Sequence, residues 1–499
     1  MSSKNQTALA VIFIYAACTS FQSPVGASVV LDDLHSRLNQ TQVAEVVTPI
    51  TVDEVQDLVR RAGKAGMAVS ISGGRHAMGG QQFGQGNLHL DMTAMKRVLA
   101  FDAKKGTVEA EAGITWPDLI AYLHEAQKDS LRRWAIRQKQ TGADRLTLGG
   151  AVSANVHGRG LTLPPFISDI VSFKLVNAAG QLLECSRTQN AELFRLATGG
   201  YGLFGVITSV KIKLASRVKL ERRVEMIQSK DLARAFQRRI AEGYLYGDFQ
   251  YNIDPRSRGF MMEGIFSCYR PVDDATPMPS SNKALSLDAW RNLAYLAHHD
   301  KRRAFDEYKR HYLSTDKQLY WSDTHSLSVY DENYHTRAEG SAAQSSEMIS
   351  ELYVPRAQLF RFLKELRKDF IRHDVNVIYG TIRVIEEDDE SFLRWAKKPW
   401  ACVIVNLHVE HDAAGLEKAK TDFRRLIDRA LSHGGAYYLT YHRWATQSQL
   451  EKAYPEFPGF MQLKRKYDPD ERFQSEWYRH YRAMYRTSST AANRRSMGL

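Results

Sequence analysis

Cysteine is scarce in this chain of 499 residues, which has only Cys18, Cys185, Cys268 and Cys402, all far apart. Their spacing forms neither a disulfide framework nor a zinc knuckle. One bridge would suit an oxidising compartment, but the sequence does not select the pair. The scarcity argues against a small disulfide-stapled scaffold and against a cysteine-ligated metal.

Long apolar runs are absent after the N-terminal segment, so we expect no transmembrane span. The run at 8–18 is itself too short to cross a bilayer as a helix, and small residues at 25–27 offer a cleavage site. We therefore expect 1–27 to be a signal peptide and the protein to be exported, to the periplasm or the medium. A lipoprotein signal that uses Cys18 is the alternative, although Tyr15 is a poor residue three places upstream.

A basic stripe is missing as well. The net charge of +12 is spread along the chain in small clusters, such as Arg238 with Arg239. A nucleic-acid-binding surface would show one basic stripe with interleaved aromatic residues. We therefore expect a solvated charged surface and no nucleic-acid partner. With 43% hydrophobic and 25% charged residues, the composition is that of a globular protein of two or three domains.

The most informative segment that is present is AVSISGGRHAMGG at 68–80. A β-branched strand runs directly into Gly73 and Gly74, which can adopt backbone conformations closed to other residues. Consecutive amides without bulky side chains form a concave donor site for an anion. The segment predicts a cofactor-phosphate loop with His76 as a nucleophile beside it. From these residues alone, a tight turn with a surface histidine is the alternative.

The hydrophobic pattern predicts two α+β units. In the first, over 36–217, Thr51 and Glu54 form a capping box for a helix that ends at Gly66. The strands expected in this unit are 68–72, 88–91, 98–101 paired with 107–112, 170–176 paired with 182–185, and 206–214. The second unit, over 218–466, is expected to have helices at 231–242, 287–296, 358–373 and 416–432, and strands at 249–253, 378–385 and 402–409. Polar stretches predict loops at 271–286 and 336–346 and a disordered tail at 486–499.

Several segments between 43 and 214 resemble the FAD-binding domain of the vanillyl-alcohol oxidase and p-cresol methylhydroxylase superfamily, known as the PCMH type. The matching segments are TPITVDEVQDLVRRAGKAG, SISGGRHAMGG, DRLTLGGAVSANVHGRG and ELFRLATGGYGLFGVITSVKIKL. The C-terminal KRKYDPDERFQSEWYRHY is similar to the branch of sugar, alditol and aldonolactone oxidases. The resemblance implies an α+β fold in which a two-lobed FAD-binding domain over 36–217 carries a cap domain over 218–466. It also implies that 467–485 returns to the FAD-binding domain.

In that family, the first loop wraps the FAD pyrophosphate, and a histidine at the position of His76 is bonded to the flavin 8α carbon. The resemblance therefore implies covalently bound FAD, with an imidazole that only hydrogen-bonds the cofactor as the alternative. The bond needs a neutral imidazole nitrogen, which histidine supplies near physiological pH. The FAD-binding residues implied in this loop are Ser72, Gly73, Gly74, Arg75, His76, Ala77, Met78 and Gly79.

The second loop, at 141–160, is implied to run along the flavin. Gly142 or its neighbour Ala143 falls near the position that governs oxygen access, and a small residue there favours an oxidase. No cysteine occurs in this loop, so no second covalent link is expected. The FAD-binding residues implied here are Thr141, Gly142, Leu148, Gly149, Gly150, Ser153, Asn155, His157 and Gly158.

The glycines at 200, 202 and 205 spell the GxGxxG dinucleotide fingerprint. Here they precede a predicted strand instead of opening a helix, so the fingerprint is a decoy and a Rossmann fold is not expected. The resemblance places this segment near the adenosine part of FAD, and two C-terminal aromatic residues at the flavin or the domain junction. The residues concerned are Gly202, Gly205, Val206, Ile207, Trp477 and Tyr478.

The cap is implied to supply the acid–base and substrate-orienting groups. Arg383 in GTIRVIE matches an arginine beside the flavin, whereas Thr381 stands where alditol-oxidase-like relatives carry glutamate. His408 and Glu410 share one face of a predicted strand and could take a hydroxyl proton. A satisfied structural pair is the alternative, and we expect no metal at His408, Glu410 and His411 because His411 faces the other way.

His442 and Arg443 lie where relatives carry a catalytic lysine, and either could stand in for it. Together these features predict an exported FAD-dependent oxidoreductase that oxidises a hydroxylated small molecule, such as a sugar, alditol, lactone or other alcohol. The substrate hydride would pass to flavin N5, with O2 as the expected oxidant of the reduced flavin. A dehydrogenase that uses a quinone or protein acceptor is one alternative, and a catalytically degenerate flavin-binding protein is another.

Overall fold

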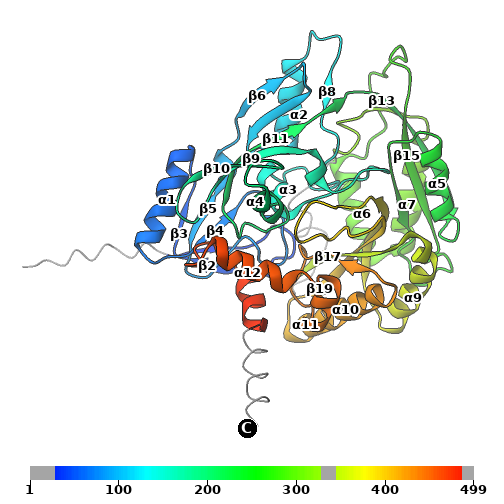
Figure 1. Ribbon diagram of the computed structural model, residues 1–499. Coiled ribbons are helices and arrows are strands. Elements are labelled where there is room, and N and C mark those ends of the chain that lie inside the picture. The colour runs from blue at the N-terminus through cyan, green and yellow to red at the C-terminus, as the bar shows by residue number, and fades with distance from the viewer. Residues whose placement is uncertain (1–27, 328–343, 486–499) are drawn as a thin grey trace, which may run out of the picture.

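A computed structural model describes residues 28–327 and 344–485. The predicted signal peptide, its Cys18 and the predicted tail at 486–499 lie outside these residues. The described chain is α+β and is divided between two small lobes and a larger unit built on one wide sheet (Figure 1). No helix in the described part is long and apolar enough to cross a membrane. Cys185, Cys268 and Cys402 are all buried and unbridged.

The first lobe is a small parallel sheet packed against helix α1 (Val52–Lys64). Its strands, in the order β3-β5-β4, are Glu45–Val47, Leu88–Asp91 and Val69–Ser72, while a separate hairpin pairs β1 (Val29–Leu31) with β2 (Thr41–Val43). The Thr51 side chain caps α1 by accepting the Glu54 amide at 3.2 Å. The Glu54 carboxylate accepts the Ile50 amide instead of the Thr51 amide. The predicted capping box is therefore only half formed.

The second lobe is an antiparallel sheet of five strands in the order β10-β9-β11-β7-β6. Both predicted hairpins are confirmed, since β6 pairs with β7 and β9 pairs with β10. The strand bounds are β6 Val98–Asp102, β7 Thr107–Glu111, β9 Ile170–Val176, β10 Leu182–Ser186 and β11 Val206–Lys213. The remaining elements of this lobe are α2 (Trp116–Ala126), α3 (Leu148–Ala154), α4 (Ala191–Ala197), and β8 (Trp134–Ala135) paired with β12 (Ala215–Ser216).

The larger unit is an antiparallel sheet of eight strands in the order β16-β13-β15-β14-β18-β19-β17-β20. Their bounds are β13 Lys219–Gln228, β14 Tyr246–Tyr251, β15 Glu263–Pro271, β16 Leu319–Trp321, β17 Ser345–Pro355, β18 Val377–Ile385, β19 Trp400–Glu410 and β20 Ala436–Tyr437. The helices are α5 Leu232–Ala241, α6 Leu287–His299, α7 Lys301–Leu313, α9 Leu359–Arg372, α10 Ala413–Ser432, α11 Gln447–Ala453 and α12 Phe457–Tyr467. Helices α9 and α10 contact β17, whereas α6 and α7 contact β18, β13 and β15.

The predicted helices and strands of this unit are all present, but several elements were not predicted. Strands β15 and β17 were not predicted because they are buried on both faces and lack a two-residue alternation. In β13 the burial alternates, but an arginine, Arg222, occupies one of the buried positions. Helix α7 was not predicted either. The loop predicted at 336–346 is wrong at its end, since Ser345 and Ser346 begin β17. The rest of that loop, up to 343, lies outside the described residues.

The last described segment pairs with the first lobe. The Val69 amide donates to the Arg472 carbonyl at 2.6 Å, and the Gln474 amide donates to the Val69 carbonyl at 3.0 Å. Figure 1 shows the red end of the chain, after α12, lying beside β4 and β2. The C-terminal segment at 472–474 therefore pairs with β4, the strand that leads into the predicted phosphate loop.

Candidate active site

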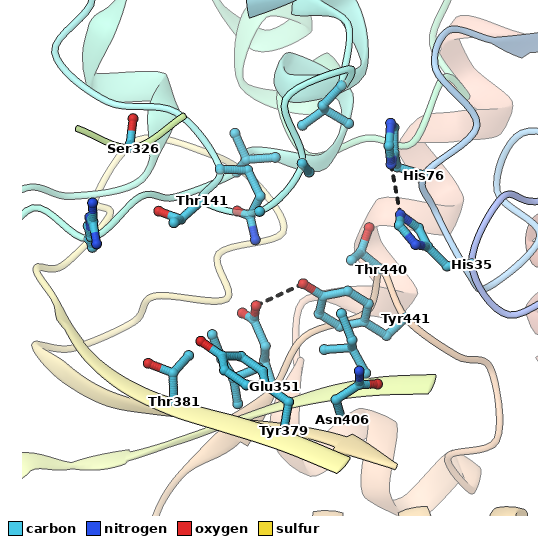
Figure 2. Close-up of a pocket in the computed structure, with 18 of the residues that line it drawn as sticks. His35, His76, Thr141, Ser326, Glu351, Tyr379, Thr381, Asn406, Thr440 and Tyr441 are labelled. Carbon is cyan, nitrogen blue, oxygen red and sulfur yellow. Dashed lines mark hydrogen bonds between the residues drawn. The ribbon is translucent and has the colours of Figure 1, made fainter. Parts of the chain in front are cut away.

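One cavity of about 650 Å³ lies between the two lobes and the wide sheet. Figure 2 shows its two walls, with His76 and His35 on the lobe side and Glu351, Tyr379 and Asn406 rising from the sheet on the other. The structure brings together there many of the predicted site residues. Those that line the cavity are Ser72, Gly73, Gly74, Arg75, His76, Ala77, Met78, Thr141, Gly142, Gly149, Gly150, Ser153, Gly202, Gly205, Ile207 and Arg383.

The loop after β4 presents its main chain to the cavity because there is no room for side chains behind it. A Cβ on Gly73 would lie 2.0 Å from Oγ1 of Thr147, and one on Gly74 would lie 2.4 Å from the Arg145 carbonyl oxygen. Arg75 follows in the left-handed conformation, with a φ of 54°. Glycine is therefore required by close packing against the start of α3, and neither Gly73 nor Gly74 needs the positive φ that the sequence allowed for.

His76 is a half-buried histidine in which one ring nitrogen lies near another histidine and the other, a buried nitrogen, has no partner among the described residues. Its Nδ1 lies 2.8 Å from Nε2 of His35, and its own Nε2 has no hydrogen-bond partner among the described residues. Burial, assisted by the nearby charge of His35, lowers the pKa of His76 to about 3. The ring is therefore neutral at physiological pH, and a neutral ring nitrogen is the nucleophilic form.

The second loop leaves space over the cavity at Gly142. This glycine has a φ of +84°, and a Cβ built there would meet nothing within 4 Å. Thr147 caps α3, where Gly149 packs so closely that a Cβ would lie 2.8 Å from Cβ of Ala112. Oγ1 of Thr141 is buried without a partner in the described structure and lines the cavity.

The GxGxxG segment follows α4 and precedes β11, so it does not open a helix, as predicted. Gly205 has a φ of +148°, and a Cβ there would lie 2.5 Å from Cδ2 of Leu175 on β9. Gly202 has a φ of +74° and lines the cavity. These glycines let the backbone pass closely between the sheet and the cavity.

On the opposite wall, β18 turns Tyr379, Thr381 and Arg383 toward the cavity at two-residue spacing. Arg383 is only 4% exposed, and its Nε and Nη1 have no hydrogen-bond partner among the described residues. A buried guanidinium with unused donors is costly unless a ligand supplies acceptors. Arg383 is therefore the strongest sequence-predicted candidate on this wall.

Glu351 on β17 was not predicted, yet it lines the cavity beside Arg383. Its carboxylate is 2.8 Å from Nε2 of His157 and accepts hydrogen bonds from the hydroxyls of Tyr353 at 3.0 Å and Tyr441 at 2.8 Å (Figure 2). Burial alone would raise the pKa of Glu351, but the charge and hydrogen bond of His157 lower it below its usual value. The sequence signal that could have revealed Glu351 is the pair Glu347 and Glu351, four residues apart in one strand and therefore on the same face.

His157 was predicted to bind the cofactor, but the structure places it behind the cavity wall, where it holds Glu351. Together with Cys402, these two residues offer ligand atoms within 4.8 Å of one another. Both ring nitrogens of His157 face hydrogen-bond acceptors, the Gly158 carbonyl at 3.0 Å and Glu351 at 2.8 Å. The arrangement is therefore a buried polar network.

Four predicted catalytic residues do not line the cavity. His408 and Glu410 bond each other at 2.9 Å where β19 continues past the end of the cavity. His442 is enclosed by the rings of Phe423, Tyr437 and Trp444. The Arg443 guanidinium lies against Gly80 instead. The predicted FAD-binding residues that stand outside the lining are Gly79, Leu148, Asn155, His157, Gly158, Val206, Trp477 and Tyr478.

These residues have packing roles that explain their positions. Asn155 ends α3 in the left-handed conformation and donates to Asp388 at 2.9 Å. The ring of Trp477 packs 5.0 Å from that of Tyr201, which itself lines the cavity. Trp477 thus supports the wall from the C-terminal segment, one layer behind the cavity.

Comparison with known proteins identifies two matching families along the chain. Residues 43–186 match the model of the FAD binding domain, and residues 331–481 match that of D-arabinono-1,4-lactone oxidase. An uncharacterized oxidoreductase from the fasciation locus of Rhodococcoides fascians is 28% identical over 243 residues, which are 46% of this chain and 52% of that protein. Mitochondrial L-galactono-1,4-lactone dehydrogenase 1 of Oryza sativa subsp. japonica is 30% identical over 194 residues, 38% and 32% of the two chains. L-gulonolactone oxidase of Bos taurus is 30% identical over 174 residues, 35% and 38% of the two chains.

The matches thus span about half the length of the first of these relatives and about a third of the other two. The cavity lies between the two lobes, which include the segment matched by the FAD binding domain, and the wide sheet, part of which lies in the segment matched by D-arabinono-1,4-lactone oxidase. The chain is therefore similar to the FAD binding domain in its N-terminal part and to D-arabinono-1,4-lactone oxidase in its C-terminal part.

Proposed function

We propose that this protein oxidises a CH–OH group of a small hydroxylated substrate, with the cavity between the lobes and the cap as its active site. The carrying observation is that His76 and Arg383 line one cavity with unsatisfied nitrogen atoms, from opposite walls. Such groups are satisfied by a ligand when the site is filled. The names of two relatives, a galactonolactone dehydrogenase and a gulonolactone oxidase, support an aldonolactone or related sugar derivative as substrate.

The residues present fit FAD. The side-chain-free backbone of Gly73 and Gly74 would hold the pyrophosphate, and Nε2 of His76 would bond to the flavin. When bound, FAD supplies the hydride acceptor. Arg383 would orient the substrate oxygen, and the ionised carboxylate of Glu351 would take the hydroxyl proton.

The covalent bond is tested by acid denaturation. We expect the yellow colour and the flavin mass to stay with the peptide that contains His76, and His76→Ala to release its flavin. His442→Phe, which replaces a buried histidine outside the cavity, is the matched control and should keep the flavin attached. A His76→Ala protein that still carries covalent flavin would refute this linkage.

The reaction is tested by anaerobic flavin bleaching with aldonolactones, alditols, sugars and aromatic alcohols. Arg383→Gln and Glu351→Gln should each lower kcat/KM for the best substrate by about a hundredfold or more. Bleaching by none of these compounds would refute the proposal and favour a non-catalytic flavoprotein.

The electron acceptor is proposed to be O2. The small residue at Gly142 supports this assignment, since it adds no side chain at a point of the cavity lining where a Cβ would meet nothing within 4 Å. Stopped-flow mixing of reduced enzyme with O2 should show rapid reoxidation. Negligible reactivity with O2, together with fast reoxidation by a quinone, would instead identify a dehydrogenase.

Export remains a separate proposal, supported by the short apolar run and small residues at 8–27. N-terminal sequencing of protein from the periplasm or the medium should begin near residue 28. Full-length protein retained in the cytoplasm would contradict it.

A further inference from the structure

The cavity extends well beyond the residues needed to hold a flavin and a hydroxyl group. At its far end lie Arg159, Arg222, Tyr269 and Tyr312, which we name the distal pocket. Arg222 is on β13, and three strand-to-strand steps separate β13 from β18, which carries Arg383. At about 4.8 Å per step, the two strands are about 14 Å apart. A substrate that reached both arginines would be longer than the group that is oxidised.

Arg222 is buried without an acidic partner. It is 5% exposed, and its Nε donates to the Ser267 hydroxyl at 2.8 Å. Its guanidinium carbon lies 4.5 Å from the ring centre of Tyr312 and 5.5 Å from that of Tyr269. No carboxylate in the described part of the chain pairs with it. The neighbouring Arg223 shows the contrast, because it pairs with Asp316 at 3.2 Å.

This end of the cavity holds further cations and one carboxylate. Arg159 is 8% exposed, lies 4.6 Å from the ring centre of Tyr269 and pairs at 3.5 Å with Asp248, which also lines the cavity. Lys283 and His311 line the cavity as well, and burial, together with the charges of Arg222 and Lys283, lowers the pKa of His311. Ring faces stabilise a guanidinium but do not neutralise it. A buried cation is normally compensated by an anion, and here the cavity offers the space for one.

We propose that the distal pocket binds an anionic group of the substrate, a carboxylate or a phosphate, while the oxidised CH–OH group lies near Arg383. Arg222 would bind the anion through its forked donors. The hydroxyls of Tyr269 and Tyr312 would add neutral donors. The position of oxidation rests on the proposed function, whereas anion binding does not.

Anion binding alone is tested on the FAD-loaded protein, in which the flavin phosphate loop is already filled. Inorganic phosphate should raise the thermal midpoint of the wild type above that in equal ionic strength of chloride. Arg222→Gln should lose this shift, and Arg223→Gln should keep it. The control changes the adjacent residue of the same strand, which faces away and is already ion-paired. No shift in the wild type, or an equal shift in Arg222→Gln, would overturn the proposal.

Substrate preference is tested with matched compounds, namely a neutral sugar or lactone and its carboxylate and phosphate derivatives. We expect one anionic member to exceed the neutral one at least tenfold in kcat/KM, chiefly through KM, and its identity separates carboxylate from phosphate. Arg222→Gln should abolish that preference, so that the anionic and neutral members give similar kcat/KM, whereas Arg223→Gln should keep it. Equal rates for neutral and anionic members would overturn the proposal without touching the proposed oxidation.

Arg222→Lys provides a second variant that keeps the charge but loses the forked donors. We expect its anionic preference to lie between those of the wild type and Arg222→Gln, and identity with the wild type would count against direct contact. Should no hydroxylated compound bleach the flavin, the oxidation proposal fails. The shift of the thermal midpoint in phosphate then still tests whether the distal pocket binds an anion.

Discussion

The pKa values of both His76 and His442 are lowered to about 3, chiefly by desolvation, although His76 is half-buried and His442 fully buried, and their surroundings differ. His76 keeps one nitrogen bonded to His35 and turns the other toward the cavity. Neither nitrogen of His442 has a hydrogen-bond partner among the described residues, and its ring centre lies 4.4 Å from that of Phe423. Desolvation thus keeps His76 neutral and nucleophilic, whereas at His442 it only lowers the stability of the folded protein.

His442→Phe should therefore stabilise the protein. The unfolded chain takes up a proton on this residue below pH 6.5 and the folded chain does so only near pH 3, so stability is lost as the pH falls from 6.5. Phenylalanine removes this loss, worth about 2 kcal/mol at pH 5, and removes a buried polar group worth about 1 kcal/mol at pH 7. Urea unfolding at both pH values measures the gain. Equal stability of the two proteins at pH 5 would contradict the prediction.

At the scale of elements, the loop after β4 and the start of α3 form one unit, because each fills the space that the other leaves. Gly73→Ala should lower the flavin content of the purified protein about tenfold, since its Cβ would lie 2.0 Å from Oγ1 of Thr147. Gly63→Ala in α1 is the control, because its Cβ would meet Arg472 at an ordinary 3.5 Å. Flavin absorbance relative to protein gives the readout. Full flavin content in Gly73→Ala would show that the loop shifts freely.

The same elements show what the sequence could and could not predict. The strand, the paired glycines and His76 are adjacent in sequence, so the local sequence pattern was enough to predict a loop with a binding role. The structure places that loop in the lining of the cavity. Glu351 escaped because its partners, His157 and Tyr441, come from distant segments that only the folded sheet brings together. His408 was misplaced for a related reason. Alternation identifies the face of a strand, but it does not show where along the strand a cavity ends.

The whole molecule depends on the C-terminal segment, which crosses from the cap back to the first lobe. Lys464 and Asp468 form an ion pair there that is 0% and 1% exposed. The Asp468 carboxylate also accepts the amides of Arg472, at 2.7 Å, and Phe473, at 2.8 Å. Those residues are the ones that pair with Val69 at the start of β4. The ion pair therefore supports the strand that delivers the phosphate loop.

Asp468→Asn should destabilise the protein by about 3 kcal/mol or more, because Lys464 would be left buried and unpaired. The amides of Arg472 and Phe473 donate to different carboxylate oxygens, so one of them would also lose its acceptor. Adding Lys464→Met should recover the part of the loss that comes from the unpaired charge. Lys466→Ala is the control. It breaks an exposed pair with Glu192, which has side chains 60% and 44% exposed, and should cost about 1 kcal/mol or less. The change in flavin fluorescence and the loss of tertiary structure should coincide during urea unfolding of Asp468→Asn, because both depend on the same strand. A flavin fluorescence change at the wild-type urea concentration would show that the C-terminal segment and the phosphate loop are independent.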